Sequence, residues 1–392
     1  MTTTAITTYE PLTEAAAIEL AAGLFPEGAT LECQEIGDGN LNYVFRVSDP
    51  VSGKGIIIKQ ALPYAKVVGE SWPLTLKRAA IEAAALRKHG EFATGLVPEV
   101  YGTDETLAYT IMEDLSHLTI AREGLIQGKS YPNLSAHIGE YLAQTLFHTS
   151  DFALHPFEKK RLVAEFSNPE LCKITEDLIF TDPFFDHDTN DFEPELRQAV
   201  EAIWRNGALK LEAAKLKRSF VTEAEALLHG DLHTGSIFAD DNETKVIDPE
   251  FAFYGPIGFD VGLFLSNLIA QGITRSGEGR KTIVNHIENT WHVFEGRFSQ
   301  LWDSEGVEDF KNIPGYREFI VEKIFRDALG FAGCELIRRT IGLAHVKDLD
   351  GIENAEQRIQ SKKLALQIGE TLIITRGELA SIQDVTALLE EL

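Results

Sequence analysis

The chain has 392 residues, which is more than one hydrophobic core usually holds, so we expect two lobes or domains. Hydrophobic residues make up 44% and charged residues 25%, as in ordinary globular proteins, while the formal net charge of −25 opposes binding to nucleic acid or to anionic membranes. No apolar run reaches membrane-spanning length, and residues 1–6 lack the pattern of a secretory signal, so we expect a cytoplasmic protein without a membrane segment.

The first fifty residues indicate a short helix, then a glycine-containing turn before a strand. Thr13 is suited to cap a helix over residues 14–20. Tyr43, Phe45 and Val47 alternate with the period of a strand, and the turn before this strand contains Gly37, Gly39 and Asn40. Such glycines let backbone amides approach a phosphate closely, although a plain hairpin turn is the simpler explanation when the turn is taken alone.

One lysine and one glutamate stand out in the strand and helix that follow. The apolar strand 55–60 carries a single charge, Lys59, near its end. In the helix expected over residues 76–88, small and apolar side chains form a buried stripe that also includes Glu82. A solvated lysine and an exposed glutamate are the ordinary alternatives. Trp72 lies in a turn before this helix, where packing in the core is one explanation of its presence.

A change from strands to helices indicates the boundary between lobes. A strand ends at Met112, and its exit consists of Glu113, Asp114 and Leu115. From about residue 120 the apolar periodicity is helical. We therefore expect two lobes joined near residues 113–116, namely an N-terminal lobe over residues 1–115 and a C-terminal lobe over residues 116–392.

Two acidic motifs close together in the chain carry the chemistry. Apolar runs deliver Asp231 within Leu228–Phe238 and Asp248 within Lys245–Glu250, with a polar turn between them, so their carboxylates are expected to converge. Phosphoryl transfer requires such carboxylates, one to receive the proton of the attacking hydroxyl and others to hold magnesium. In an extended chain Asp248 and Glu250 point to one side, with Pro249 fixing the backbone between them. A polar hairpin with surface acids is the alternative.

The last features are a paired arginine and three isolated cysteines. Arg338 and Arg339 lie near the end of a long helix expected over residues 320–342, and alone they would be read as solvated surface residues. The cysteines are far apart and show no spacing typical of a zinc site or a disulfide framework, so we expect buried, apolar positions for Cys33, Cys172 and Cys334.

The acidic motifs resemble a known family. An HGD loop with a downstream acidic motif is typical of protein-kinase-like small-molecule kinases, and the stretches 229–238 and 247–262 resemble the methylthioribose kinases among them. Ser236 stands where protein kinases have a metal-binding Asn, and Glu250 stands where the Asp-Phe-Gly motif ends in Gly. Both departures are similar to methylthioribose kinases.

This resemblance implies an α+β, protein-kinase-like bilobal fold with a small β-rich N-lobe and a larger helical C-lobe. It also implies transfer of the γ-phosphoryl of ATP to the 1-hydroxyl of 5-methylthioribose in methionine salvage, with Mg²⁺ as cofactor and a homodimeric assembly. The residues that it assigns to ATP and the metal are Gly37, Gly39, Asn40, Lys59 with its partner Glu82, the hinge Glu113–Leu115, and Asp248, Pro249 and Glu250. The residues that it assigns to the sugar and its chemistry are Asp231, Arg338, Arg339 and Trp72.

Two alternatives stay open at this point. Another small-molecule kinase of the same fold, acting on an aminoglycoside, choline or homoserine, fits the same motifs. A cationic substrate would suit the acidic surface, but it would favour acids or aromatics where this chain offers arginines. A non-catalytic nucleotide-binding module is the second alternative, although that class usually lacks the base, the lysine or the metal ligands.

Overall fold

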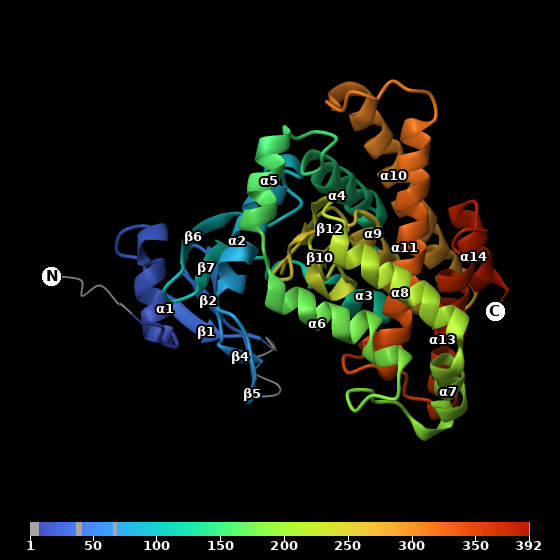
Figure 1. Cartoon of the computed structure of the whole chain (residues 1–392). Helices are drawn as coiled ribbons and strands as arrows, with labels where there is room; N and C mark the ends of the chain where they lie inside the picture. The colour runs from blue at the N-terminus through green and yellow to red at the C-terminus, as the bar shows by residue number, and fades with distance from the viewer. Residues whose placement is uncertain (1–7, 37–40, 66–68, 392) are drawn as a thin grey trace. The chain divides into compact units, whose positions relative to one another are not determined.

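The computed structural model describes residues 8–36, 41–65 and 69–391, without the side chains of residues 65 and 69–73 (Figure 1). The chain forms two compact units, the first up to Leu118 together with Lys245–Phe251, and the second Thr119–Thr244 with Ala252–Leu392. The sequence placed the boundary at residue 115 and the acidic motif at 248–250 in the C-terminal lobe. In the structure the acidic motif belongs to the first unit, because residues 245–251 return to it.

The first unit contains a five-stranded antiparallel sheet in the order β1-β2-β3-β7-β6. Its strands are β1 (Glu32–Glu35), β2 (Asn42–Ser48), β3 (Gly55–Ala61), β6 (Val100–Asp104) and β7 (Tyr109–Glu113). A short pair, β4 (Tyr64–Ala65) and β5 (Gly69–Pro73), follows β3. The helical elements of this unit are α1 (Glu14–Ala21), η1 (Ala22–Leu24) and α2 (Lys77–Phe92).

Alternation along the strands separates the core of the first unit from the opposite face of the sheet. Ile56 and Ile58 of β3 are fully buried and pack with Phe45, Val47 and the buried alanines of α1. Since successive strand residues point to opposite faces, Lys59 lies on the face opposite this core. The predicted cap of α1 is confirmed, because the Thr13 side chain accepts a hydrogen bond from the Ala16 N–H at 3.2 Å.

The second unit is mostly helical. Its long helices are α4 (Leu134–His148), α8 (Gly207–Thr222), α9 (Gly258–Ile273), α10 (Gly277–Glu305), α11 (Tyr316–Ile341) and α13 (Ala355–Thr375). Its shorter helical elements are α3 (Ala121–Ile126), α5 (Pro156–Glu165), α6 (Pro169–Phe180), η2 (Asp182–Phe184), η3 (Pro194–Leu196), α7 (Arg197–Arg205), η4 (Thr234–Ser236), α12 (Lys347–Asp350) and α14 (Ile382–Glu390). Two small antiparallel ladders join β8 (Thr119–Ile120) to β10 (Ile237–Ala239) and β9 (Ala226–Leu227) to β12 (Tyr254–Gly255), while β11 (Thr244–Val246) leads back into the first unit.

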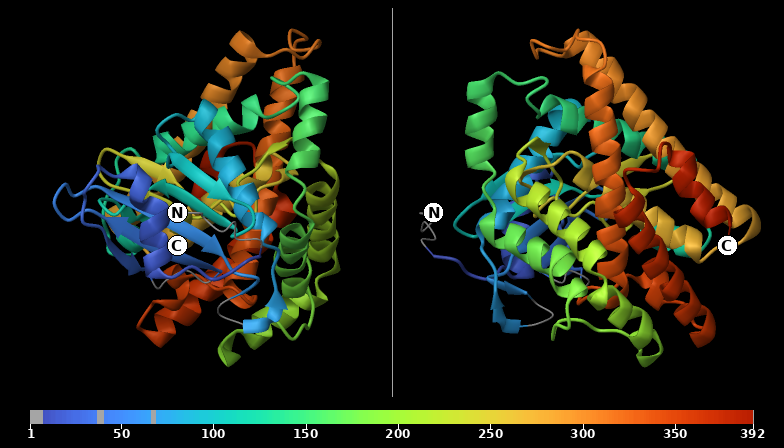
Figure 2. Two further views of the ribbon diagram at one scale, coloured as in Figure 1. Left: turned by 90° about the vertical axis from the view of Figure 1, so that its left-hand side faces the viewer. Right: turned by 45° about the vertical axis from the view of Figure 1, so that its right-hand side comes forward.

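Helix α11 lies at the centre of the second unit. It packs along α9 and α13, and residues 306–315 connect it to α10 (Figure 2). Large aromatic side chains fill the core beneath it: the ring centroids of Phe331 and Phe259 lie 5.3 Å apart, and those of Phe331 and Phe180 lie 5.8 Å apart. This core fixes the C-terminal part of α11, which carries the arginine pair.

The predicted fold class is confirmed: a β-rich unit and a larger helical unit are both present. The strand expected to end at Met112 is β7, which begins at Tyr109 and ends at Glu113; Leu107 and Ala108 belong to the turn before it, in which Ala108 has a φ of 53°. Of the cysteines, Cys334 is buried as expected, whereas Cys33 and Cys172 are only partly buried. Within the described residues, no helix combines the length and apolarity that crossing a membrane requires.

The aromatic core predicts a large cost for removing Phe331. Its side chain is 0% exposed, so Phe331→Ala should leave a cavity and lower the unfolding free energy of the helical unit by about 3–5 kcal/mol. Phe319 lies on the same helix but is 59% exposed, and Phe319→Ala should change stability by less than about 0.5 kcal/mol. Urea unfolding followed by circular dichroism measures both, and similar effects of the two substitutions would contradict this account of the core.

Candidate active site

Lys59 is the centre of a buried charge cluster in the first unit. Its Nζ donates to Glu82 Oε1 at 2.9 Å and also contacts a carboxylate oxygen of Asp248. Burial alone would lower the pKa of Lys59, but the carboxylates of Asp248, Glu82 and Glu250 raise it above its ordinary value, so the amine is charged. Glu82 is 3% exposed, which excludes the alternative of a solvent-exposed glutamate. The contacts with Glu82 and Asp248 therefore fix the position of the Lys59 amine.

Arg78, which the sequence did not single out, holds Glu250 in the same unit. The guanidinium is fully buried, and its Nε donates to Glu250 Oε2 at 3.0 Å. The remaining donors bind Asn42 Oδ1 at 3.1 Å and main-chain carbonyls, including that of Leu62 at 2.7 Å. Burial raises the pKa of Glu250 and Asp248 adds to this, against the opposing effect of Lys59. Arg78 lies one helical turn before Glu82 on α2, so one helix positions both acids.

The backbone at Asp248 differs from the extended chain that the sequence suggested. Asp248 has a φ of 71°, in the left-handed region that costs a non-glycine residue about 1 kcal/mol or more. The sequence predicted an extended chain that places Asp248 and Glu250 on one side. The chain is not extended at Asp248, so this prediction of an extended chain is wrong. Their environments also differ: the Asp248 side chain is 39% exposed, whereas that of Glu250 is 5% exposed, and Pro249 between them is buried.

The predicted hinge residues have their side chains engaged within the first unit. Glu113 accepts from Lys245 Nζ at 3.1 Å, and Asp114 accepts from Arg46 Nε at 2.7 Å. Leu115 is buried, and its carbonyl accepts from the Leu118 N–H at 2.9 Å. These contacts fix the course of the segment, and they are compatible with adenine recognition through main-chain groups.

In the second unit, Asp231 lies on a tight loop fixed by a buried carboxylate. Gly230, with a φ of 86°, provides the left-handed turn just before Asp231. Asp260 on α9 is 1% exposed and accepts from the main-chain N–H groups of His229 at 2.6 Å and of Gly230 at 3.0 Å. The loop that presents Asp231 is thus anchored directly to the helical core.

The predicted arginine pair lies beside Asp231. Nη2 of Arg339 is 3.2 Å and Nη2 of Arg338 is 3.8 Å from Asp231 Oδ1. Glu335, fully buried on the same helix, accepts from Arg338 Nε at 3.0 Å and from Arg339 Nε at 2.5 Å. Both arginines are 8% exposed, so the alternative of solvated surface arginines is excluded.

His233 and Ser236 complete the loop. His233 Nε2 lies 3.5 Å from Asp231 Oδ2, and its Nδ1 lies 3.1 Å from Ser236 Oγ. Burial lowers the pKa of His233 well below its usual range, and the charges of Arg122 and Arg339 lower it further, so the ring is neutral. Ser236, which stands where protein kinases place a metal-binding Asn, thus has its hydroxyl directed at an imidazole.

Several predicted residues lie outside this geometry. Gly37, Gly39 and Asn40 lie outside the described residues, as does the side chain of Trp72, whose backbone belongs to β5. Asp231 belongs to the second unit and Asp248 to the first, and their convergence stays a prediction. His345 is partly exposed, and its Nδ1 lies 2.9 Å from Asp350 Oδ2.

The acids near Lys59 fit a magnesium ion that arrives with a nucleotide. Within the described residues, no group of three or more His, Cys, Asp or Glu side chains is arranged to hold a metal. Mg²⁺ commonly takes one or two carboxylates and completes its shell with phosphates and waters. Asp248 and Glu250 supply that donor type, so the metal would depend on the phosphates for its other ligands.

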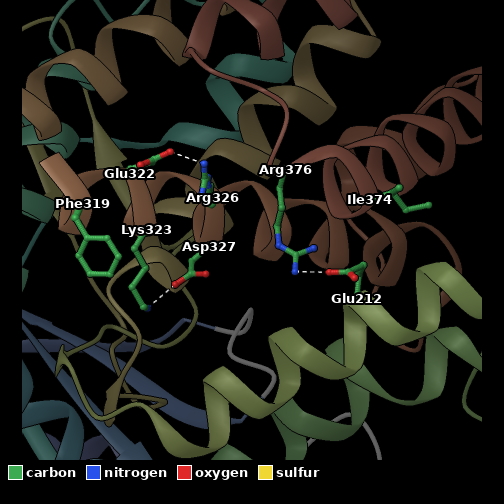
Figure 3. A pocket seen from close by; sticks show the side chains of 9 residues that line it. Glu212, Phe319, Glu322, Lys323, Arg326, Asp327, Ile374 and Arg376 are labelled. Carbon is green, nitrogen blue, oxygen red and sulfur yellow. Dashed lines mark hydrogen bonds and ion pairs between the residues drawn. The ribbon is translucent and has the colours of Figure 1, made fainter.

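A surface hollow of about 560 Å³ between α8, α11 and the end of α13 is a different kind of feature (Figure 3). Its charged side chains pair with one another, as in the contacts of Lys323 with Asp327 at 2.7 Å and of Arg376 with Glu212 at 2.6 Å. Twelve residues of α11 separate Asp327 from Arg339, which corresponds to about 18 Å along the helix. The hollow is therefore separate from the cluster formed by Arg338, Arg339 and Asp231.

Comparison with known proteins defines the class. A family model described as "Phosphotransferase enzyme family" matches residues 32–292, more than half of the chain, which includes Lys59, Glu82, Asp231 and Asp248. The chain is a member of this kinase-like class of enzymes.

Close relatives narrow the class further. The chain is 60% identical to "Methylthioribose kinase" of Geobacillus sp. (strain WCH70), over 98% of this chain and 97% of the relative. It is 60% identical to that of Geobacillus kaustophilus (strain HTA426), over 100% and 99%, and 55% identical to that of Bacillus pumilus (strain SAFR-032), over 98% and 97%. The chain belongs to the methylthioribose kinase family.

Removing the charge of Glu335 should destabilise the second unit in a pH-dependent way. Burial alone would raise the pKa of Glu335, but Arg338 and Arg339 lower it below its ordinary value of 4.5. Its stabilisation is therefore present above about pH 4.5 and is lost as the pH falls through the lowered pKa. Glu335→Gln should lower the unfolding free energy by about 3–5 kcal/mol at pH 7 and by less under acid conditions.

Glu322→Gln is the matched control, because Glu322 pairs with Arg326 on the same helix but its side chain is 57% exposed. Its effect should stay below about 1 kcal/mol. Chemical denaturation of both variants at several pH values measures the difference, and a cost at Glu335 that does not change with pH would contradict the assigned charge state.

Proposed function

We propose that the chain transfers the γ-phosphoryl group of ATP to the 1-hydroxyl of 5-methylthioribose, giving S-methyl-5-thioribose 1-phosphate for methionine salvage. The observation that carries this proposal is the contact of Asp231 with both arginines of the pair, within a chain 60% identical to methylthioribose kinases. A base beside two fixed positive charges suits attack of a neutral hydroxyl on an anionic phosphoryl group.

In this mechanism Asp231 accepts the proton of the sugar hydroxyl. The hydroxyl oxygen forms a bond to the γ-phosphorus while the bond from that phosphorus to the β,γ-bridging oxygen breaks, and ADP leaves. Arg338 and Arg339 stabilise the negative charge on the phosphoryl group in transit. Because Glu335 directs both guanidinium groups, their donors are in place before the substrate binds.

The first unit supplies the nucleotide-binding residues in this proposal. Lys59, aimed by Glu82, pairs with the phosphates of ATP, and the hinge main chain at Glu113–Leu115 contacts the adenine. Asp248 and Glu250 hold Mg²⁺, which neutralises phosphate charge when it is bound. Because Asp248 contacts Lys59 directly, nucleotide binding exchanges this ion pair for phosphate and metal contacts.

Choline and aminoglycosides suit this site less well than a neutral sugar. Either cation would lie beside Arg338 and Arg339, whose charges oppose it. The assignment of Trp72 to the substrate, the homodimeric assembly and the cytoplasmic location stay predictions.

The test of the proposed function combines a substrate panel with Asp231→Asn. The wild type should phosphorylate methylthioribose and leave choline and kanamycin unmodified. Asp231→Asn is nearly isosteric but cannot accept a proton, so kcat should fall by about 10²–10⁴-fold while ATP binding persists.

Asp241→Asn removes an exposed carboxylate from the turn after the same loop, and it should keep kcat within about twofold. Product formation followed by phosphorus NMR identifies the phosphorylated position. Phosphorylation of choline with methylthioribose inert would overturn the substrate, and an Asp231→Asn enzyme with nearly full kcat would overturn the base.

The two acids at 248 and 250 should respond differently to neutralisation. Asp248→Asn removes a half-exposed carboxylate and should raise the Mg²⁺ concentration for half-maximal activity about tenfold or more, with little loss of stability. Glu250→Gln also weakens the contact with buried Arg78, so it should additionally lower the unfolding free energy by about 1–3 kcal/mol. Magnesium titrations and thermal unfolding of both variants check this, and unchanged magnesium dependence in both would remove the metal role.

A further inference from the structure

A third arginine, Arg122, lies against the loop that carries Asp231. It belongs to the first turn of α3, directly after the short strand β8 that pairs with β10. A Cβ added at Gly235 would lie 2.7 Å from Nη1 and 3.1 Å from Cζ of Arg122, which is closer than side chains normally pack. The φ of Gly235 is not in the left-handed region, so the need for glycine arises from the guanidinium group and not from backbone strain.

Arg122 cannot move away easily, because buried groups hold it on its other sides. Its Nη2 donates to Asn267 Oδ1 at 2.9 Å, and its Nε lies 3.1 Å from Asp348 Oδ2. The Asp348 side chain is 1% exposed and is itself held by Gln271, whose Nε2 donates to it at 2.5 Å. Breaking this pair would leave a buried carboxylate without its counter-charge, which is costly. The guanidinium group of Arg122 is therefore fixed in place against the loop that carries Asp231.

Asn267 provides a second connection between Arg122 and the loop. Its Oδ1 also accepts from Thr234 Oγ1 at 3.3 Å, and its Nδ2 donates to the Leu263 carbonyl of α9 at 3.0 Å. Thr234 and Gly235 belong to the turn η4, which is flanked by His233 and ends at Ser236. His233 in turn lies 3.5 Å from Asp231.

We propose that Arg122 is a positioning residue for phosphoryl transfer: by packing against Gly235 it fixes the turn 234–236 and, through His233, the orientation of the Asp231 carboxylate. This inference rests on the proposed role of Asp231 as the base. It assigns no contact of Arg122 with substrate. Because the Arg122 guanidinium lies directly against Gly235, substitutions at the two positions should affect each other, and this dependence can be measured.

A double-mutant cycle of Arg122→Ala and Gly235→Ala tests the pair. The added methyl group should force Arg122 and the turn apart, so Gly235→Ala should lower kcat about tenfold or more, with KM for ATP and methylthioribose changed by less than about threefold. In the Arg122→Ala background the methyl group has room, and the same substitution should change kcat by less than about twofold. An equal loss in both backgrounds would overturn the proposal, because the methyl group would then act on His233, whose Cε1 lies 3.1 Å away.

Two further variants separate positioning from folding. Arg122→Ala leaves Asp348 unpaired, so the cycle is repeated with Asp348→Asn, which removes the orphaned charge. Arg376→Ala is the matched control, since Arg376 is also paired with a carboxylate, packs near Gly330 and has a side chain 16% exposed, against 15% for Arg122. It should keep kcat within about twofold, and a loss comparable to that of Arg122→Ala would indicate a general structural effect and overturn the proposal.

The imidazole of His233 provides a readout that does not need turnover. Arg122, Arg339, Glu335, His229 and Asp231 are charged or titratable groups near His233, and the two arginines help to lower its pKa. In NMR titrations the pKa of His233 should rise in Arg122→Ala, and also in Gly235→Ala, where the arginine is displaced, but it should stay unchanged in Arg376→Ala. An unchanged value in both former variants would overturn the proposal. If the wild type fails to phosphorylate methylthioribose, the proposed function is wrong. The titration of His233 still tests whether Arg122 fixes the turn 234–236.

Discussion

The buried carboxylate of Glu335 is the constraint on which the arginine pair beside Asp231 depends. Two guanidinium groups cannot be buried side by side without a counter-charge, and Glu335 supplies it from within the same helix turn. With their Nε atoms bound to Glu335, the distal nitrogens of Arg338 and Arg339 face Asp231. The aromatic core beneath α11 then fixes the whole group relative to the loop 229–236.

In the first unit, buried acidic groups are likewise compensated by charges of the opposite sign. Lys59 and Arg78 face the carboxyl groups of Glu82, Asp248 and Glu250, so acidic groups outnumber basic ones in this cluster. The chain as a whole has a net charge of −25, and long-range attraction therefore does not bring a polyanion to this site. In the proposed function, nucleotide binding therefore depends on locally placed cations, and each basic side chain here is held by more than one contact.

The sequence predicted the residues that belong to linear motifs and missed those that act across elements. Lys59, Glu82, Asp231 and the arginine pair were found because the resemblance attaches a role to each position. Arg78 had a local signal, since it lies one turn before Glu82 on the buried stripe of α2, but a charged residue in such a stripe is normally read as solvated. Arg122 had no comparable signal, because its partners Gly235 and Asp348 are more than a hundred residues away. Glu335 lies three and four residues before its partners Arg338 and Arg339, but such a spacing is equally typical of an exposed helix surface. The left-handed backbone of Asp248 could not be read from an Asp-Pro pair, for which an extended conformation is the ordinary expectation.

That backbone conformation narrows what evolution can place at position 248. Glutamate would keep the carboxylate but would adopt a positive φ less readily than Asp, Asn or Gly, so the main chain opposes lengthening of the side chain. Of the three residues that tolerate the conformation, only Asp carries a charge. Because the Asp248 carboxylate also contacts Lys59, Gly or Asn would keep the main-chain conformation but lose this ion pair, so the two requirements together leave Asp alone at this position.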